Sequence, residues 1–143
     1  MIKEKAIETL KIEIDALQKL LGRVDDEFEA AVRAILDCKA RVIVTGIGKS
    51  GHVGQKIAAS LASTGTPAFF MHPAEAFHGD LGMVTQHDIV LAISNSGETN
   101  EIVNILPVIR RIGAQIIALG GRRASTLGQN ADCFIDAGVE KEA

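Results

Sequence analysis

Two short loops rich in glycine and hydroxyl side chains hold the residues best suited to chemistry. The first is Gly46-Ile47-Gly48-Lys49-Ser50-Gly51, which follows an apolar run and precedes a helical stretch. Its glycines match the pattern G-x-G-x-x-G, in which backbone amides at a helix start hold an anion. The acidic residue that a dinucleotide ribose requires is missing, because Met71-His72-Pro73 ends the next apolar run. A P-loop is excluded because Ile43 stands at its first glycine. The loop therefore predicts an anion-binding turn that carries one lysine and one serine hydroxyl.

The second loop is Ser94-Asn95-Ser96-Gly97-Glu98-Thr99, again at a predicted helix start. Hydroxyls and free helix amides can both donate hydrogen bonds to a phosphate, and the helix dipole favours an anion there. Helix capping would explain one such residue. Ser94, Ser96 and Thr99 make three, and Gly97 permits close approach of a ligand. We therefore favour a phosphate site over capping alone.

Candidate acids and bases lie near both loops. Glu98 and Glu101 fit first-turn acids that complement a helix dipole, and they equally fit a carboxylate that moves a proton. His78, followed by Gly79-Asp80, could act as an acid or base near neutral pH at the rim of the pocket. Its spacing from His72 is not a common metal-binding pattern. The sequence predicts no metal site, and the Gly46–Gly51 pattern leaves a nicotinamide site as a minor alternative.

The elements that must position these loops are short apolar runs alternating with helical stretches. The runs are nearly continuous in apolar character, as in parallel strands covered on both faces. They are Arg41–Thr45, Ala68–Met71, Asp88–Ser94, Gln115–Leu119 and Cys133–Asp136. The helical stretches between them are roughly Gly51–Thr64, a short piece after Pro73, Asn100–Ile112 and Ser125–Asn130. This alternation predicts an α/β fold with a doubly wound, five-stranded parallel sheet. In the flavodoxin-like strand order 2-1-3-4-5, the two loops would meet where the order reverses.

Two helices are expected before the sheet, within residues 1–38, and the α/β core within 41–143, giving a single domain over 1–143. The first helix carries one narrow apolar stripe with a spacing of three and four residues. Its members are Ile7, Leu10, Ile14, Leu17 and Leu21. Such a stripe suits packing on another subunit and packing on its own domain equally well.

Composition narrows the class of protein. The 143 residues are 47% hydrophobic and 23% charged, with a net charge of -3 and neither Trp nor Tyr. A nucleic-acid partner is not expected, since basic excess and stacking aromatics are both missing. The longest uncharged stretch, residues 57–74, is interrupted by Gly65, Pro67 and Pro73, so no membrane span is predicted. Two widely separated cysteines fit a reducing cytoplasm.

With these motifs together, the chain resembles the sugar isomerase (SIS) domain family, and within it the arabinose-5-phosphate isomerases. The resemblance is carried by residues 46–52 (GIGKSGH), 62–67 (ASTGTP), 72–83 (HPAEAFHGDLGM) and 93–98 (ISNSGE). It implies reversible interconversion of D-ribulose 5-phosphate and D-arabinose 5-phosphate, which feeds Kdo synthesis for lipopolysaccharide and capsules. It also implies a homotetramer or homodimer without a cofactor.

The resemblance also implies roles for single residues. A glutamate, Glu101 or Glu142, would be the base that moves a proton between C1 and C2 through an enediolate. Lys49 would stabilise the developing charge, and His78 would open the ring or protonate an oxygen. The phosphate would be bound by Gly48, Ser50, Gly51, Thr64, Ser94, Ser96, Gly97 and Thr99.

Members of that family continue past the position of Ala143 with a Ser/Thr-rich helix, a distal histidine and usually two CBS repeats, which are not in this sequence. The rival interpretation is a SIS module that senses a sugar phosphate without catalysis. Such a module needs the serine loop but not Lys49, His78 and Glu101 together.

Overall fold

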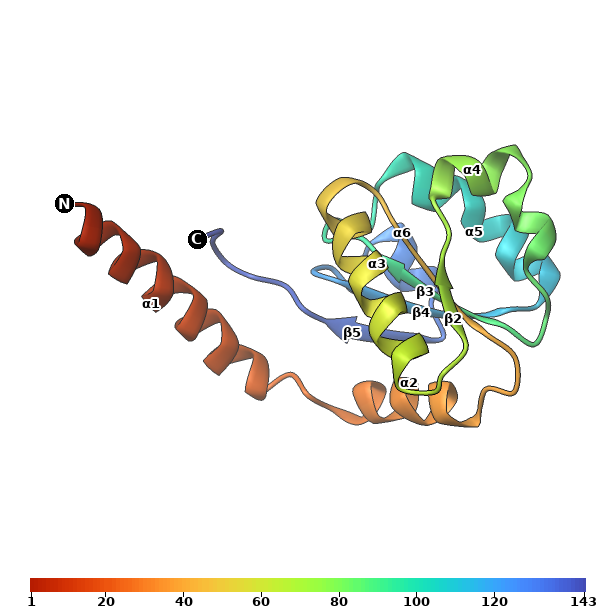
Figure 1. Cartoon of the computed structure of the whole chain (residues 1–143), viewed down its shortest axis with the longest axis horizontal. Coiled ribbons are helices and arrows are strands. Elements are labelled where there is room, and N and C mark those ends of the chain that lie inside the picture. The colour runs from red at the N-terminus through yellow and green to blue at the C-terminus, as the bar shows by residue number, and fades with distance from the viewer.

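Five parallel strands form one sheet in the computed structural model, which describes residues 1–143 (Figure 1). The strands are β1 (Val42–Gly46), β2 (Ala68–Phe70), β3 (Ile89–Ile93), β4 (Gln115–Gly120) and β5 (Cys133–Asp136). Their order is β2-β1-β3-β4-β5, and every neighbouring pair is parallel. The predicted doubly wound sheet and its strand order are confirmed, and each strand lies within a residue or so of the predicted apolar run.

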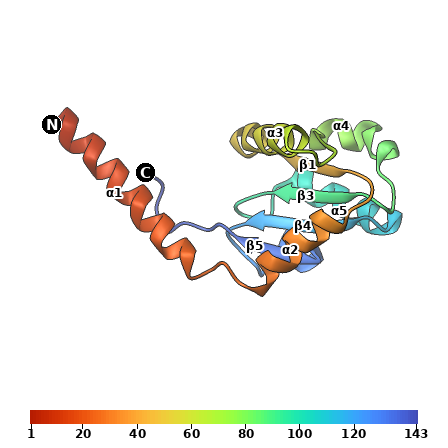
Figure 2. The same ribbon diagram turned by 60° about the horizontal axis from the view of Figure 1, so that its bottom comes forward.

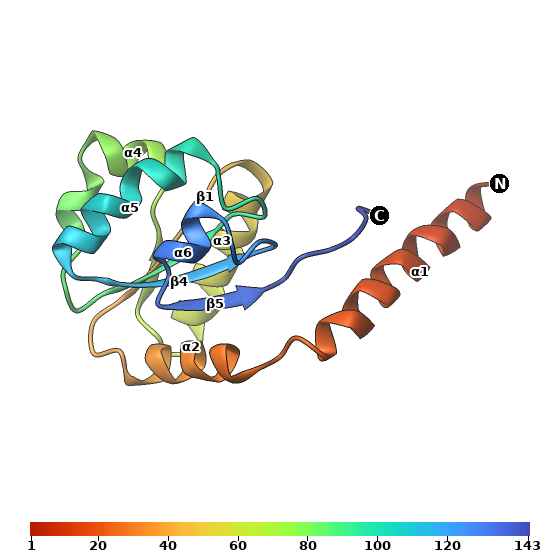
Figure 3. The ribbon, with the colours of Figure 1, turned by 180° about the vertical axis from the view of Figure 1, so that it is seen from behind.

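Helices cover both faces of this sheet (Figures 2 and 3). On one face lie α2 (Asp26–Asp37) and α3 (Gly48–Ser63). On the other lie α4 (Pro73–His78), α5 (Asn100–Ile112) and α6 (Thr126–Asn130), with a 3₁₀ turn at Asp80–Met83. Because both faces are covered, alternate residues of one strand enter different cores. Val42 and Val44 pack toward α2 and α3, while Ile43 packs toward α5.

One carboxylate is buried in an ion pair at the amino edge of the sheet. The Asp88 carboxylate, in a residue only 1% exposed, accepts hydrogen bonds from the Arg41 guanidinium at 2.8 and 3.0 Å and from the Thr85 amide at 2.7 Å. Burial by itself would raise the pKa of Asp88, but the bonds from Arg41 and Thr85 outweigh it and hold that pKa below its ordinary value. These hydrogen bonds hold the residues that precede β3 in place.

Helix α1 (Ile2–Leu21) projects away from the sheet (Figure 1). None of its residues is buried, and the whole apolar stripe is exposed, with Ile14 at 53% and Leu17 at 63%. Within one chain, the stripe therefore does not pack on its own domain. No helix here combines the length and the apolar character needed to cross a bilayer.

Candidate active site at the carboxyl edge of β1 and β3

The strand order reverses between β1 and β3, because the chain leaves β1 toward β2 and leaves β3 toward β4. In open α/β sheets, ligands bind outside the carboxyl ends of the strands at this point. The Gly46–Gly51 loop follows β1 and the Ser94–Thr99 loop follows β3. The fold therefore brings the two predicted loops to neighbouring positions.

Helix α3 begins at Gly48, three residues earlier than the sequence suggested, because Gly48 turns the chain with a φ of 58°. Gly51 lets the helix pack closely on β1, since a Cβ there would lie 2.7 Å from the Gly46 carbonyl oxygen. At Gly54 a Cβ would lie 3.2 Å from Val44 and from Phe70. The predicted glycine pattern thus sets the contact between helix and strand and leaves the amides of the first turn at the sheet edge.

The Ser94–Thr99 loop is held by its own hydroxyl groups. The buried Ser94 Oγ accepts a hydrogen bond from the Gly97 amide at 3.0 Å and lies 2.9 Å from Thr99 Oγ1. Ser96 Oγ accepts from the Glu98 amide at 3.2 Å. All three predicted hydroxyl side chains therefore lie within one turn of chain at the start of α5.

Helices α3 and α5 lack the side-chain caps that the other helices packed on the sheet have. Helices α2, α4 and α6 each have a side chain that accepts a hydrogen bond from their first turn, supplied by Asp25, His72 and Ser125. Ile47 and Thr99 precede α3 and α5 and make no such bond. The two helix starts at the strand-order reversal thus keep unpaired amides, which can bind an anion.

The predicted catalytic side chains of this edge are exposed. Lys49 is in the first turn of α3 and Glu101 in the first turn of α5, so each stands at one of the two uncapped helix starts. His78 is the last residue of α4, which packs on α5, and its ring meets Phe77 edge-on with centroids 5.9 Å apart. The fold places Lys49 and Glu101 at neighbouring helix starts and His78 on α4, which packs on α5.

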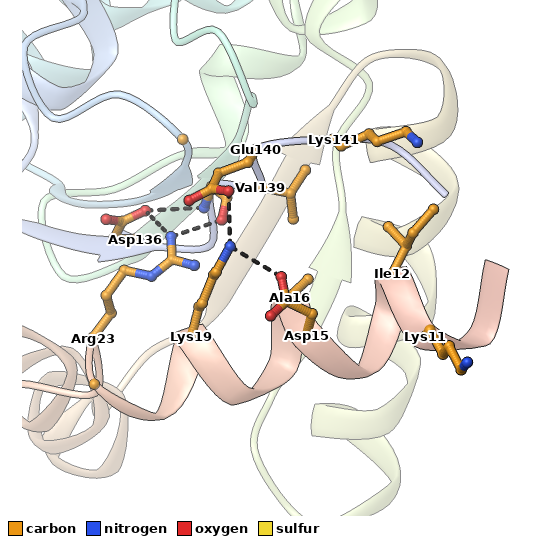
Figure 4. A pocket seen from close by; sticks show the side chains of 13 residues that line it. Lys11, Ile12, Asp15, Ala16, Lys19, Arg23, Asp136, Val139, Glu140 and Lys141 are labelled. Atoms are coloured by element: carbon orange, nitrogen blue, oxygen red, sulfur yellow. Dashed lines mark hydrogen bonds and ion pairs between the residues drawn. The ribbon is translucent and has the colours of Figure 1, made fainter. Parts of the chain in front are cut away.

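Glu142 lies elsewhere within one chain. It belongs to the exposed segment after β5, an edge strand that β3 and β4 separate from β1, about 14 Å at usual strand spacing. That segment runs beside α1 and lines a cleft of about 870 Å³ with it (Figure 4). There Lys19 Nζ lies 2.8 Å from Glu140 and 3.0 Å from Asp15, and these carboxylates raise the pKa of Lys19.

Within a single chain, Thr64 does not lie with the other residues of the predicted phosphate site. It caps the carboxyl end of α3, and its hydroxyl donates to the carbonyl oxygens of Ser60 and Leu61. A helix of 16 residues is about 24 Å long. Thr64 therefore lies at the opposite edge of the sheet from Gly48 and Ser50.

Sequence reasoning missed the partner of Glu98. Glu98 precedes α5 rather than lying in its first turn, and its carboxylate accepts hydrogen bonds from the Thr126 amide and hydroxyl, both at 2.7 Å. These bonds, the one from the amide first, lower the pKa of Glu98. The only sequence signal was the pair Ser125-Thr126, which marks the start of a helical stretch.

Comparison with known proteins agrees with this fold. A family model described as SIS domain matches residues 35–143. This chain belongs to the SIS domain family. The SIS domain is 55% identical over 135 residues to arabinose 5-phosphate isomerase KdsD of Pseudomonas aeruginosa, covering 94% of this chain and 41% of that protein. It is 50% identical over 141 residues to the KdsD protein of Francisella tularensis, covering 96% and 43%. The chain therefore spans about two fifths of the length of these relatives.

Solved structures also resemble this SIS domain. An Escherichia coli CFT073 protein in complex with arabinose 5-phosphate superimposes with a TM-score of 0.85 at 38% identity, covering 99% of this chain and 78% of that one. A Listeria monocytogenes structure gives a TM-score of 0.94 at 30% identity, covering 99% and 74%.

Proposed function

We propose that this SIS domain is the isomerase domain of an enzyme that interconverts D-ribulose 5-phosphate and D-arabinose 5-phosphate, supplying the sugar for Kdo. The observation that carries the proposal is the pair of uncapped helix starts at the strand-order reversal, one with Lys49 and the other with Glu101. The names of its relatives give the substrate, because curated proteins about 50% identical over most of this chain are arabinose 5-phosphate isomerases.

The chemistry divides between binding and proton transfer. The phosphate would be held by the hydroxyls of Ser50, Ser94, Ser96 and Thr99, and Gly48, Gly51 and Gly97 would let it approach the backbone. A glutamate would carry a proton between C1 and C2 as the base. Lys49 would stabilise the enediolate, because it is the cation at the start of α3. His78 would open the ring or protonate an oxygen.

Glu101 fits the base better than Glu142 within one chain, because only Glu101 lies at a helix start next to that of Lys49. Glu142 would reach the site of a second copy. We therefore propose a homodimer or homotetramer, supported by the exposed apolar stripe of α1, which has no partner within one chain. A cytoplasmic location is consistent with both cysteines being free thiols.

The decisive experiment follows the reaction by NMR. The chain is mixed with ribulose 5-phosphate in D₂O, and new aldose signals with deuterium at the exchanging carbon are expected. Binding without these signals would favour the sensing module. Absence of both binding and turnover would refute the proposed site.

Variants test the phosphate loop separately. Ser94→Ala with Ser96→Ala removes hydrogen bonds to a charged group, each worth about 1.5–3 kcal/mol, so sugar-phosphate affinity should fall by at least tenfold. Ser63→Ala, at the far end of α3, is the matched control and should bind like the unchanged chain. Equal affinities for both variants would show that the Ser94–Thr99 loop does not bind the phosphate.

A further inference from the structure

The Ser94–Thr99 loop is tied to the start of α6, a contact between segments 28 residues apart in sequence. Glu98 reaches out of the loop, and one carboxylate oxygen accepts from the Thr126 amide while the other accepts from the Thr126 hydroxyl. Both oxygens are thus engaged by one residue. Glu98 is therefore directed toward α6 and away from a role as a free acid or base.

A second contact holds the preceding residue. The Gly97 carbonyl accepts a hydrogen bond from the Leu127 amide at 3.0 Å. Gly97 also lies against the buried Ser125, whose Cβ would be 2.5 Å from a Cβ added to Gly97. Ser125 in turn caps α6 by accepting from the Gly128 amide at 3.1 Å. The first turn of α6 thus fixes two successive residues of the loop.

Those two residues hold the hydroxyl groups of the proposed phosphate site. The Gly97 and Glu98 amides bond to Ser94 Oγ and Ser96 Oγ. A shift of Gly97 or Glu98 would therefore move both hydroxyls. From this we infer that Glu98 is a positioning residue, whose two hydrogen bonds to Thr126 hold the Ser94–Thr99 loop in the shape that binds a sugar phosphate. The inference rests on the proposed function.

A carboxylate suits this task for an electrostatic reason. A free glutamate beside the loop would repel a bound phosphate. Accepting two hydrogen bonds from Thr126 fixes the negative charge on the α6 side, and the lowered pKa keeps it ionised. The same side chain thus holds the loop and keeps its charge in one place.

Thr126→Pro removes both donors with little other change. Thr126 is the first residue of α6, a position that tolerates proline. The preceding Ser125, with φ −69° and ψ 165°, already has the extended conformation that a following proline requires. Its cap to Gly128 needs nothing from Thr126. Thr126→Ser is the matched control, because it keeps the amide and the hydroxyl.

Two measurements are made on the ligand-free and ligand-bound chain. Calorimetry gives the dissociation constant for arabinose 5-phosphate. Amide hydrogen exchange reports on Gly97 and Glu98 without ligand. We expect Thr126→Pro to bind about tenfold to 10²-fold more weakly, since a displaced hydroxyl loses its hydrogen bond to the charged phosphate. Exchange at Gly97 and Glu98 should be faster in this variant while core amides are unchanged. Thr126→Ser should restore both values.

The outcomes separate this inference from the proposed function. Equal affinity of Thr126→Pro and Thr126→Ser overturns the positioning role. If the unchanged chain binds no sugar phosphate, the proposed function fails, and equal exchange at Gly97 and Glu98 in the two variants then overturns the positioning role independently. If circular dichroism shows that Thr126→Pro is unfolded, Thr126→Val replaces it. That variant loses only the hydroxyl donor, and affinity equal to that of Thr126→Ser overturns the inference.

Discussion

Replacing Gly97 with alanine perturbs the loop at the point where it touches α6. Two separate costs are expected. The φ of Gly97 is 67°, a left-handed conformation that costs a non-glycine residue about 1–2 kcal/mol. The new Cβ would also lie 2.5 Å from the Ser125 Cβ, and overpacking a buried contact costs about 1–3 kcal/mol. The free energy of unfolding should therefore fall by about 2–5 kcal/mol.

Gly48→Ala is the matched control, because Gly48 has a similar φ of 58° and nothing within 4 Å of the added Cβ. It should lose only the conformational part, about 1–2 kcal/mol. Urea unfolding at equal chain concentration gives both free energies by linear extrapolation.

A double variant isolates the steric part. Gly97→Ala with Ser125→Gly removes the colliding side chain, and glycine replaces a serine cap at a cost of only a few tenths of a kcal/mol. It should recover most of the steric loss. Equal losses for Gly97→Ala and Gly48→Ala would refute the reasoning, because the contact with Ser125 would then cost nothing.

Three further predictions concern the rest of the chain. Asp88→Asn should lower the free energy of unfolding by about 3 kcal/mol, the low end for a broken buried pair, because Arg41 is partly exposed. Since its folded pKa is lowered, the stability from Asp88 is complete above about pH 4 and is lost as the pH falls below it, which urea titrations at several pH values would show. Thr45→Val should raise thermal stability, because the buried Thr45 hydroxyl has no hydrogen-bond partner. Ile14→Asp with Leu17→Asp should lower the mass measured by light scattering, and a monomeric unchanged chain would contradict that prediction.

Most of the fold could be predicted because it depends on local patterns. The runs around Val42–Gly46 and Ile89–Ile93 are apolar without alternation, which only strands covered on both faces require. Helix α5 occupies the predicted residues 100–112, where an apolar face ends in the left-handed Gly113. The start of α3 was missed because the left-handed Gly48 enters the helix directly.

The site could be predicted only in part, because a sequence motif does not give the distance between residues that are far apart in the chain. Ser94, Ser96 and Thr99 lie together because they are close neighbours in one loop. Thr64 follows the same helix as Lys49, yet the length of α3 carries it to the other edge. The Glu98–Thr126 contact joins the Ser94–Thr99 loop to the start of α6, 28 residues later. The Ser125-Thr126 pair marks a helix start in the sequence but does not indicate that Glu98 is its partner.

The three glycines of the Gly46–Gly51 loop have a consequence for how such patterns are interpreted. A Cβ at Gly46 or Gly51 would meet backbone atoms of the same turn, at 3.1 Å and 2.7 Å. A glycine pattern that marks dinucleotide binding in other proteins is thus required here because the start of α3 lies so close to the end of β1. A methyl group at either position would push the first turn of α3 away from the end of β1. Alanine substitutions at Gly46 or Gly51 would consequently change the distance between α3 and β1, so a loss of binding in such a variant would not by itself identify a ligand contact.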